Sequence, residues 1–167
     1  MSVRFSARLV VAATLVLAFL LPLPAARADE AAALAGIWKC VSQVFEFQDG
    51  SPPRPLLGEH PLGYLILTPQ GRMMAFVEGE GRKAPASDAE AVAAFRSMIA
   101  YTGVYTVHGN SWTTKVDGAW NPAWKGTEQV RTFSLQGDRL EVVTMWQPQV
   151  NFGGKVGRAL LVWERVR

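Results

Sequence analysis

The sequence has 167 residues, with 17 Lys and Arg against 14 Asp and Glu, a formal net charge of +3 and one cysteine. A single cysteine excludes an intrachain disulfide. Three of the arginines lie in the N-terminal segment described next, so the rest of the chain is close to neutral. Its composition therefore gives no indication of binding to nucleic acid or to an anionic membrane surface.

Residues 1–28 have the features of a secretory signal peptide. Arg4 and Arg8 precede an apolar run from Leu9 to Leu21, and the small residues around Arg27 suit a signal peptidase. The apolar run is shorter than the roughly 20 residues that cross a bilayer. We therefore expect cleavage after Ala28, export to the periplasm or medium, no stable membrane anchor, and one domain over residues 29–167.

The first half of this domain predicts strands joined by turns. Gly36–Phe47 is rich in β-branched and aromatic residues without a helical period, which is typical of a long strand. A loop with four prolines follows over Gln48–Pro61. Gly63–Thr68 and Arg72–Glu78 predict a hairpin, because Gly71 between them can adopt the positive φ that a tight turn requires.

One helix is expected between the third and fourth strands. Ser87 and Glu90 have the spacing of a capping box, and Ala91–Tyr101 places apolar residues at helical intervals, which predicts about three turns with an apolar stripe packed on the protein. Five more strands follow at hairpin spacing: Val104–His108, Ser111–Asp117, Gln129–Leu135, Leu140–Trp146 and Arg158–Val166. Eight antiparallel strands predict an all-β barrel or sandwich, and only a closed barrel removes exposed strand edges.

Sequence blocks along most of the chain resemble a known family. Gly36-Ile37-Trp38 is similar to the G-x-W signature of lipocalins. Further blocks follow in the family's order: Pro61–Tyr64, Thr68–Met73, Tyr101–Tyr105, Trp124–Arg131 and Trp163–Arg165. Together they resemble the bacterial and fungal lipocalin-like domain family. The resemblance implies an eight-stranded up-and-down β-barrel of the calycin type, with the helix across or beside one end.

The resemblance implies an architecture more than an activity. Many relatives have no assigned activity, and others act in polyketide and terpenoid pathways as binding or cyclisation modules. Family members often carry histidines where this chain has Thr114 and Lys115, so chemistry based on those imidazoles is not expected. By analogy with lipocalins, Trp38 should plug the closed end, with Arg165 from the last strand over its ring as a cation–π partner.

Catalytic and metal sites have little support in the sequence. His60 and His108 are the only histidines, and neither has a second ligand at metal spacing, so we expect no metal and no cofactor. The serines lack a G-x-S-x-G context. Cys40 is expected to be a buried, inert thiol. An enzyme is therefore not the preferred interpretation.

Arg131 and a set of large apolar residues are the candidates for ligand binding. Arg131 lies mid-strand, where it either faces solvent or points inward and holds a carboxylate or enolate, with Glu128 or Tyr105 as its partner in the empty barrel. The aromatic residues either fill the barrel or line it, and a Pro-containing loop could close its mouth. The predicted ligand-binding residues are Tyr64, Met74, Phe76, Tyr105, Trp112, Trp120, Trp124, Arg131 and Trp146.

Three functions remain open at this point. The preferred one is an exported barrel that binds a small, largely apolar molecule, with Arg131 or Tyr105 orienting its polar end. The second is a cyclase or isomerase whose cavity shapes an apolar substrate while His60, Arg131 or a tyrosine moves a proton. The third is a structural or protein-binding barrel with a filled core. An internal cavity would separate the third from the other two, and the ligand and the oligomeric state stay open.

Overall fold

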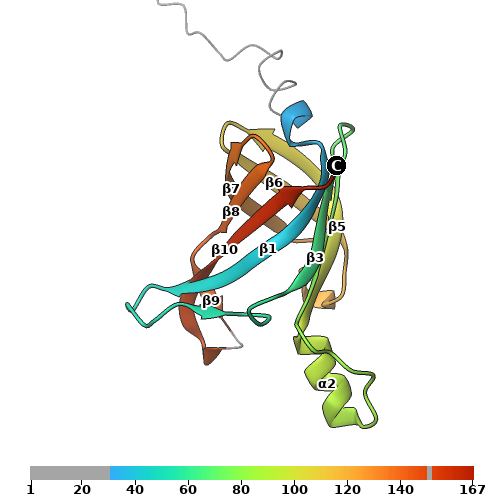
Figure 1. The fold of residues 1–167 in the computed structure, drawn as a ribbon, viewed down its shortest axis with the longest axis vertical. Helices are drawn as coiled ribbons and strands as arrows, with labels where there is room; N and C mark the ends of the chain where they lie inside the picture. Colours follow the sequence, from blue (N-terminus) through green and yellow to red (C-terminus); the bar gives the residue numbers. More distant parts are fainter. Residues whose placement is uncertain (1–30, 150–151) are drawn as a thin grey trace, which may run out of the picture.

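The computed structural model describes residues 31–149 and 152–167, and the predicted signal peptide lies outside them. The elements are β1 (Gly36–Phe47), β2 (Arg54–Pro55), β3 (Leu62–Leu67), β4 (Arg72–Glu78), α2 (Asp88–Arg96), β5 (Met98–His108), β6 (Ser111–Ala119), η1 (Pro122–Trp124), β7 (Glu128–Gln136), β8 (Arg139–Thr144), β9 (Gln147–Gln149) and β10 (Lys155–Arg165). β1, β3 to β8 and β10 pair antiparallel in chain order, and β1 also pairs with β10, which closes the barrel (Figure 1). The expected eight-stranded closed barrel is confirmed.

The hairpin of β3 and β4 shows why these residues form a half-buried sheet. Leu65 and Leu67 on β3 and Met73 on β4 are buried, whereas the residues between them face outward, as the period of two requires. Gly71 in the connecting turn has a φ of 83°, a conformation that side chains with a Cβ rarely adopt. The predicted hairpin and the role of its glycine are therefore confirmed.

An irregularity in β1 changes which of its side chains face the interior. The register between β1 and β10 shifts between Cys40 and Ser42. Before the shift Trp38 and Cys40 are buried, and after it Gln43 and Phe45 are buried. An extra residue in one strand reverses the alternation of inward and outward side chains. A polar residue, Gln43, is thereby turned into the barrel.

The helix is shorter than predicted and lies beside one end of the barrel (Figure 1). Its capping box is partly as expected, since Ser87 Oγ accepts a hydrogen bond of 3.3 Å from the Glu90 backbone N–H. Residues 98–101, predicted to be helical, instead begin β5 and pair with β4, because cross-strand hydrogen bonds and burial outweigh local helical periodicity there. The expected apolar stripe is only partly packed, because Val92 and Phe95 are 48% and 44% exposed, although the Phe95 ring contacts Trp120.

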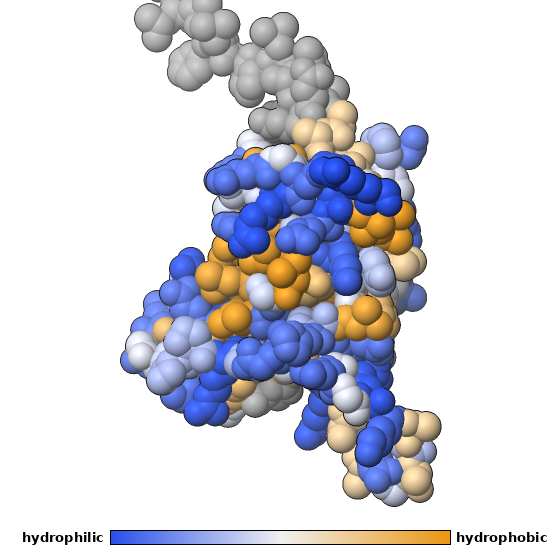
Figure 2. All heavy atoms as spheres, viewed as in Figure 1, coloured by the Kyte–Doolittle hydropathy of each residue, from blue (hydrophilic) through white to orange (hydrophobic). Residues whose placement is uncertain are grey.

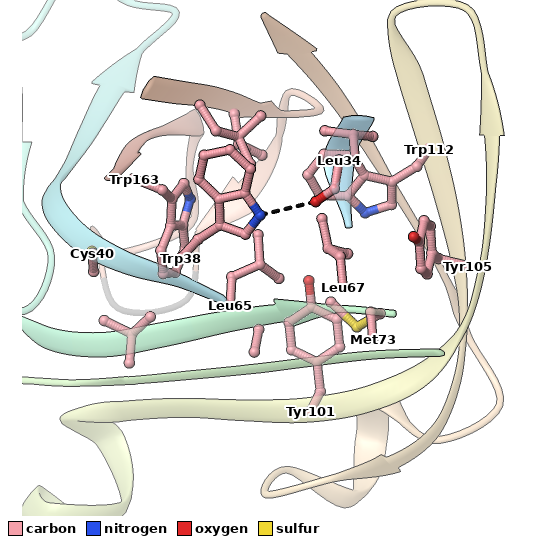
Figure 3. Packing of buried hydrophobic residues seen from close by; sticks show 14 of the residues in the cluster. Leu34, Trp38, Cys40, Leu65, Leu67, Met73, Tyr101, Tyr105, Trp112 and Trp163 are labelled. Atoms are coloured by element: carbon pink, nitrogen blue, oxygen red, sulfur yellow. Dashed lines mark hydrogen bonds between the residues drawn. The ribbon is translucent and has the colours of Figure 1, made fainter. Parts of the chain in front are cut away.

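The opposite end of the barrel is closed by packing around Trp38. This residue is fully buried, and its indole Nε1 donates a hydrogen bond of 3.0 Å to the carbonyl oxygen of Leu34, in the helical turn at 31–34 (Figure 3). The guanidinium carbon of Arg165 lies 4.1 Å from the centroid of the indole ring. Two of its nitrogens donate to the carbonyl oxygens of Ala35 and Ala33, at 2.7 and 2.8 Å. The expected cation–π cover is confirmed.

The outer surface of the barrel carries apolar residues of its own. Figure 2 shows apolar side chains gathered over β1 and β10, between polar regions. Ile37 and Val41 on β1, Tyr64 on β3 and Met74 on β4 are between 39% and 51% exposed. An apolar residue in a strand of this protein therefore does not by itself indicate the interior.

Candidate functional site

The barrel is hollow toward the end where α2 lies. The hollow is a cavity of about 410 Å³, and every one of the eight barrel strands contributes to its lining. Much of the wall is aliphatic, with Leu65, Val77, Val142 and Leu161 among its residues. A cavity of this size falls within the roughly 300–1,000 Å³ of sites that hold small molecules. The barrel therefore has room for a ligand, which the sequence left open.

Four aromatic residues, Phe95, Tyr101, Trp120 and Trp124, form a connected group at one side of the cavity, here called the rim cluster. Ring centroids are 6.0 Å apart for Phe95 and Trp120, 5.0 Å for Trp120 and Trp124, and 5.3 Å for Tyr101 and Trp124. The indole Nε1 of Trp120 also donates to the carbonyl oxygen of Phe95, at 3.1 Å. The rim cluster thus ties the end of α2 to the barrel wall.

The local sequence explains how the two tryptophans reach the rim. β6 ends at Ala119, and the side chain of Asn121 then accepts a hydrogen bond of 3.0 Å from the backbone N–H of Ala123, which caps η1. Pro122 occupies the first turn of η1, where its lack of an N–H costs nothing. The loop between β6 and β7 therefore has a fixed shape that holds Trp120 and Trp124 beside the cavity.

Arg131 on β7 points into the barrel. It is 8% exposed, lines the cavity and lies opposite Trp112 on β6 and Thr144 on β8. Its Nη1 donates to the carbonyl oxygen of Val130 at 2.8 Å, and its Nη2 donates to the side-chain oxygen of Gln129 at 3.2 Å. The direction that the sequence could not decide is therefore inward.

Neither residue expected to pair with Arg131 does so. Glu128 lies on the outside of the barrel, where its carboxylate is 3.8 Å from the Lys115 ammonium and both side chains are exposed. Strand alternation explains this, because Glu128 lies on the face of β7 opposite to Gln129 and Arg131. Tyr105 donates its hydroxyl to the carbonyl oxygen of Thr68 at 2.9 Å, so it is already paired.

The structure brings four of the nine predicted ligand-binding residues to the cavity and leaves five away from its lining. Trp112, Trp120, Trp124 and Arg131 line it. Tyr64, Met74 and Phe76 belong to the outward-facing residues of β3 and β4. Tyr105 packs in the core beyond the cavity. Trp146 lies past the end of β8, with the guanidinium carbon of Arg158 4.5 Å from the centroid of its ring. Their position away from the lining has a physical cause, since both faces of these strands carry large apolar residues and residue type alone does not give the face.

Several cavity residues were missed at the sequence level. Gln43 was hidden by the bulge in β1, and Tyr101 was assigned to the helix that ends earlier than expected. Trp163 lines the cavity as well and was read only as part of a family block. The Nε1 atoms of Trp112 and Trp163 and the Oε1 atom of Gln43 have no hydrogen-bond partner among the described residues. Gln43 is one of several polar residues in β1, beside Lys39, Ser42 and Glu46, so the sequence offered no signal that set it apart.

The histidines and the cysteine lie away from the cavity. His60 and His108 are both exposed, one in the loop before β3 and one at the end of β5, and neither lines the cavity. Residues 31–149 and 152–167 contain no cluster of His, Cys, Asp and Glu that could hold a metal ion. Cys40 is 4% exposed, and burial raises the pKa of its thiol to about 11, which keeps it protonated and unreactive near neutral pH.

Comparisons with known proteins agree with this architecture. A family model described as a lipocalin-like domain matches residues 35–166, a range that contains every barrel strand. No curated protein matches the chain. In the part of the chain that the structure describes, no helix is long and apolar enough to cross a membrane.

Proposed function

The chain belongs to the lipocalin-like domain family, and we propose that it binds a small, largely apolar molecule inside its barrel. The cavity of about 410 Å³ carries this proposal, because its wall is made mostly of aliphatic and aromatic side chains. Transfer of apolar ligand surface from water to such a wall is favourable by about 25 cal/mol for each Å² removed from water. A hollow barrel with this lining suits an apolar ligand of small size.

The rim cluster and Arg131 have different roles in the proposed binding, one apolar and one polar. The aromatic rings of the rim cluster offer large, rigid apolar surfaces beside the cavity. Arg131 provides a fixed polar group within it, held by its hydrogen bonds to Val130 and Gln129. A few fixed polar groups in an apolar cavity orient a ligand and give selectivity. The proposed ligand therefore has an apolar body and at least one polar group.

The other two interpretations of the sequence have less support. A filled barrel does not fit the cavity. Of the proton carriers considered for an enzyme, Arg131 and Tyr101 line the cavity, whereas His60 is exposed and does not. Among the described residues, the cavity wall contains no carboxylate that could act in its place. Binding without chemistry is the function that these side chains support best.

Ligand binding is tested by titrating the purified protein with Nile red, a neutral apolar dye, and by native mass spectrometry of the protein as isolated. We expect saturable dye fluorescence, quenching of tryptophan emission because Trp112, Trp120, Trp124 and Trp163 line the cavity, and a co-purified small molecule. The control is Ala75→Phe, which fills the cavity from β4. No saturable binding and no co-purified molecule would overturn the proposal.

Export is proposed separately, on the N-terminal sequence alone. Residues 1–28 have a basic start, an apolar run and small residues at a cleavage site. Mass spectrometry of the protein recovered from the periplasm or medium should show a chain that begins at Asp29. A protein retained in the cytoplasm with residues 1–28 intact would contradict it.

A further inference from the structure

We infer that the molecule held in the cavity is an anion, with an apolar body and one deprotonated acid group of the carboxylate kind bound by the guanidinium of Arg131. The inference rests on the proposed binding function and adds the chemical class of the ligand. The guanidinium, the charge of the wall and the apolar surroundings each contribute to it.

The guanidinium of Arg131 is buried without an acidic partner. The residue is 8% exposed, and its two hydrogen bonds within the described chain go to neutral oxygens, the carbonyl of Val130 and the amide of Gln129. A guanidinium has five N–H donors, so three are left for other acceptors. A cation removed from water is strongly unfavourable unless an anion lies beside it. A bound anion would supply both the acceptors and the opposite charge.

Every charged side chain that lines the cavity is cationic. Arg131 lies inside and Arg96 lies at the end of α2, and no Asp or Glu of residues 31–149 and 152–167 belongs to the lining. Glu128, the nearest acid along the chain, pairs with Lys115 on the outside. Arg131 is buried and Arg96 is exposed, and both contribute a positive potential that attracts anions and repels cations, the buried one more strongly. The wall therefore selects for the sign of the ligand's charge.

A chain of neutral hydrogen bonds fixes the position of the guanidinium. Gln129, which accepts from Arg131, donates from its Nε2 to the hydroxyl of Thr127 at 3.0 Å. That hydroxyl donates to the carbonyl oxygen of Trp124, a member of the rim cluster, at 2.7 Å. A guanidinium already held in place loses little freedom when it binds, and its planar fork matches the two oxygens of a carboxylate.

The remainder of the wall argues for one acid group and an apolar body. Leu65, Val142 and Leu161 are typical of the lining, and the other buried polar side chain there is the amide of Gln43. Further donors are present, since the indole N–H groups of Trp112 and Trp163 line the cavity and have no partner among the described residues. The charge is what limits the ligand: a phosphate monoester carries about 1.5 to 2 negative charges near neutral pH, more than the one buried guanidinium compensates. A monoanionic carboxylate matches that single charge.

The inference is tested by the displacement of Nile red with three probes that share one alkyl chain: dodecanoate, dodecanol and dodecyltrimethylammonium. We expect dodecanoate to bind about ten- to a hundred-fold more tightly than dodecanol, as hydrogen bonds to charged groups contribute. The ammonium should bind most weakly. Since the three probes share the same apolar chain, the difference reports on the charge of the head group.

Variants locate the effect at Arg131. In Arg131→Met, which keeps the side-chain length, dodecanoate should lose at least ten-fold in affinity, while dodecanol should change less than three-fold. Arg131→Lys keeps the charge without the planar fork and should recover part of the affinity. The matched control is Arg139→Gln, which removes an exposed cation on β8 outside the cavity and should leave both affinities unchanged. Circular dichroism of each variant confirms that the barrel is folded.

The outcomes are distinct. Tight binding of dodecanol with no preference for dodecanoate would overturn the anion inference and leave the proposed function standing. Equal loss of both probes in a folded Arg131→Met would also overturn it, because the arginine would then act on cavity shape. If wild-type protein binds neither Nile red nor any of the probes, the proposed function fails, and the inference fails with it.

Discussion

The two ends of the barrel each place an arginine among aromatic rings, but they differ in how the charge is compensated. At the closed end, Arg165 covers Trp38, donates to two backbone carbonyls and lies 3.5 Å from the carboxylate of Asp138. The pKa of Asp138 is lowered, first by its hydrogen bond with Arg167 and further by the charge of Arg165, so this carboxylate stays ionised. At the hollow end, Arg131 has neutral partners only among the described residues.

This difference separates a structural region from the proposed binding region. At the closed end, the buried ring of Trp38 contributes to stability, and Arg165 above it already has an acidic partner. A cavity with an uncompensated cation costs stability in the empty protein and gains it back when an anion binds. Substitutions at the closed end should therefore act on unfolding, and substitutions at the hollow end on binding.

Trp38→Ala should give the largest effect on stability. Truncation of a fully buried tryptophan leaves a large void and removes the ring that Arg165 covers, so the free energy of unfolding should fall by about 3–5 kcal/mol. Urea unfolding followed by circular dichroism measures it. The control is Trp120→Ala at the rim, which should cost about 1 kcal/mol or less. A larger loss for Trp120→Ala would contradict the assignment of stability to the closed end.

A larger side chain should reduce binding when it is placed in the cavity and reduce stability when it is placed in the packed core. Ala75→Phe places a ring into the cavity and should reduce Nile red affinity by at least ten-fold, with a change of about 1 kcal/mol or less in unfolding free energy. Val107→Phe adds volume to the packed core outside the cavity lining and should cost about 1–3 kcal/mol while binding is kept. Equal destabilisation by both variants would show that the hollow end is packed as tightly as the closed end.

Trp120→Ala should also change the rate of ligand exchange. Trp120 contacts Phe95 and Trp124 and hydrogen-bonds the end of α2, so its removal opens the rim cluster. Dissociation of Nile red in stopped-flow experiments should become faster, on the order of ten-fold, with a smaller effect on association. Trp146→Ala, which removes a tryptophan that does not line the cavity, should leave both rates unchanged. Unaltered dissociation in Trp120→Ala would rule out a gating role for the rim.

The last effect is confined to alkaline pH. Burial raises the pKa of Cys40 from its ordinary value of 9.0 to about 11, so the folded protein holds this proton more tightly than the unfolded chain. Stability from this group is complete below 9.0 and is lost as pH rises through about 11. Urea midpoints should fall over this window, and less so in Cys40→Ala. Burial raises the pKa of Tyr105 as well, so part of the fall should remain in that variant.

The strands and their turns could be predicted from the sequence because their signals are local. Alternating residues define β3 and β4, and Gly71 marks the turn between them. Such features depend on neighbours a few residues away, which a single sequence displays directly. The closed end with Arg165 over Trp38 was expected from the resemblance to lipocalins, because the two residues lie on the first and last strands of the barrel.

The cavity could be predicted only in part because its lining depends on strand parity and on competition between elements. The bulge in β1 turns Gln43 inward. Tyr101, predicted to be helical, instead lies in β5 because that segment pairs with β4. Tyr64 and Met74 were taken as lining residues on their apolar character, yet they face outward. Trp112, Trp120, Trp124 and Arg131, the four candidates that do line the cavity, all come from the aromatic stretch around η1.

By itself, the sequence determined that this chain is an eight-stranded barrel of the lipocalin-like domain family. It also singled out Arg131 as the charged residue in a strand that could hold a ligand. Only the tertiary structure decided that the barrel is hollow, that Arg131 points inward, and that no described acid shares the cavity with it. The reason is physical: the direction of a side chain in a strand alternates with every residue, so one bulge or one early helix end reverses it. Charge compensation, in turn, depends on strands that are distant in the chain and meet only when the barrel closes.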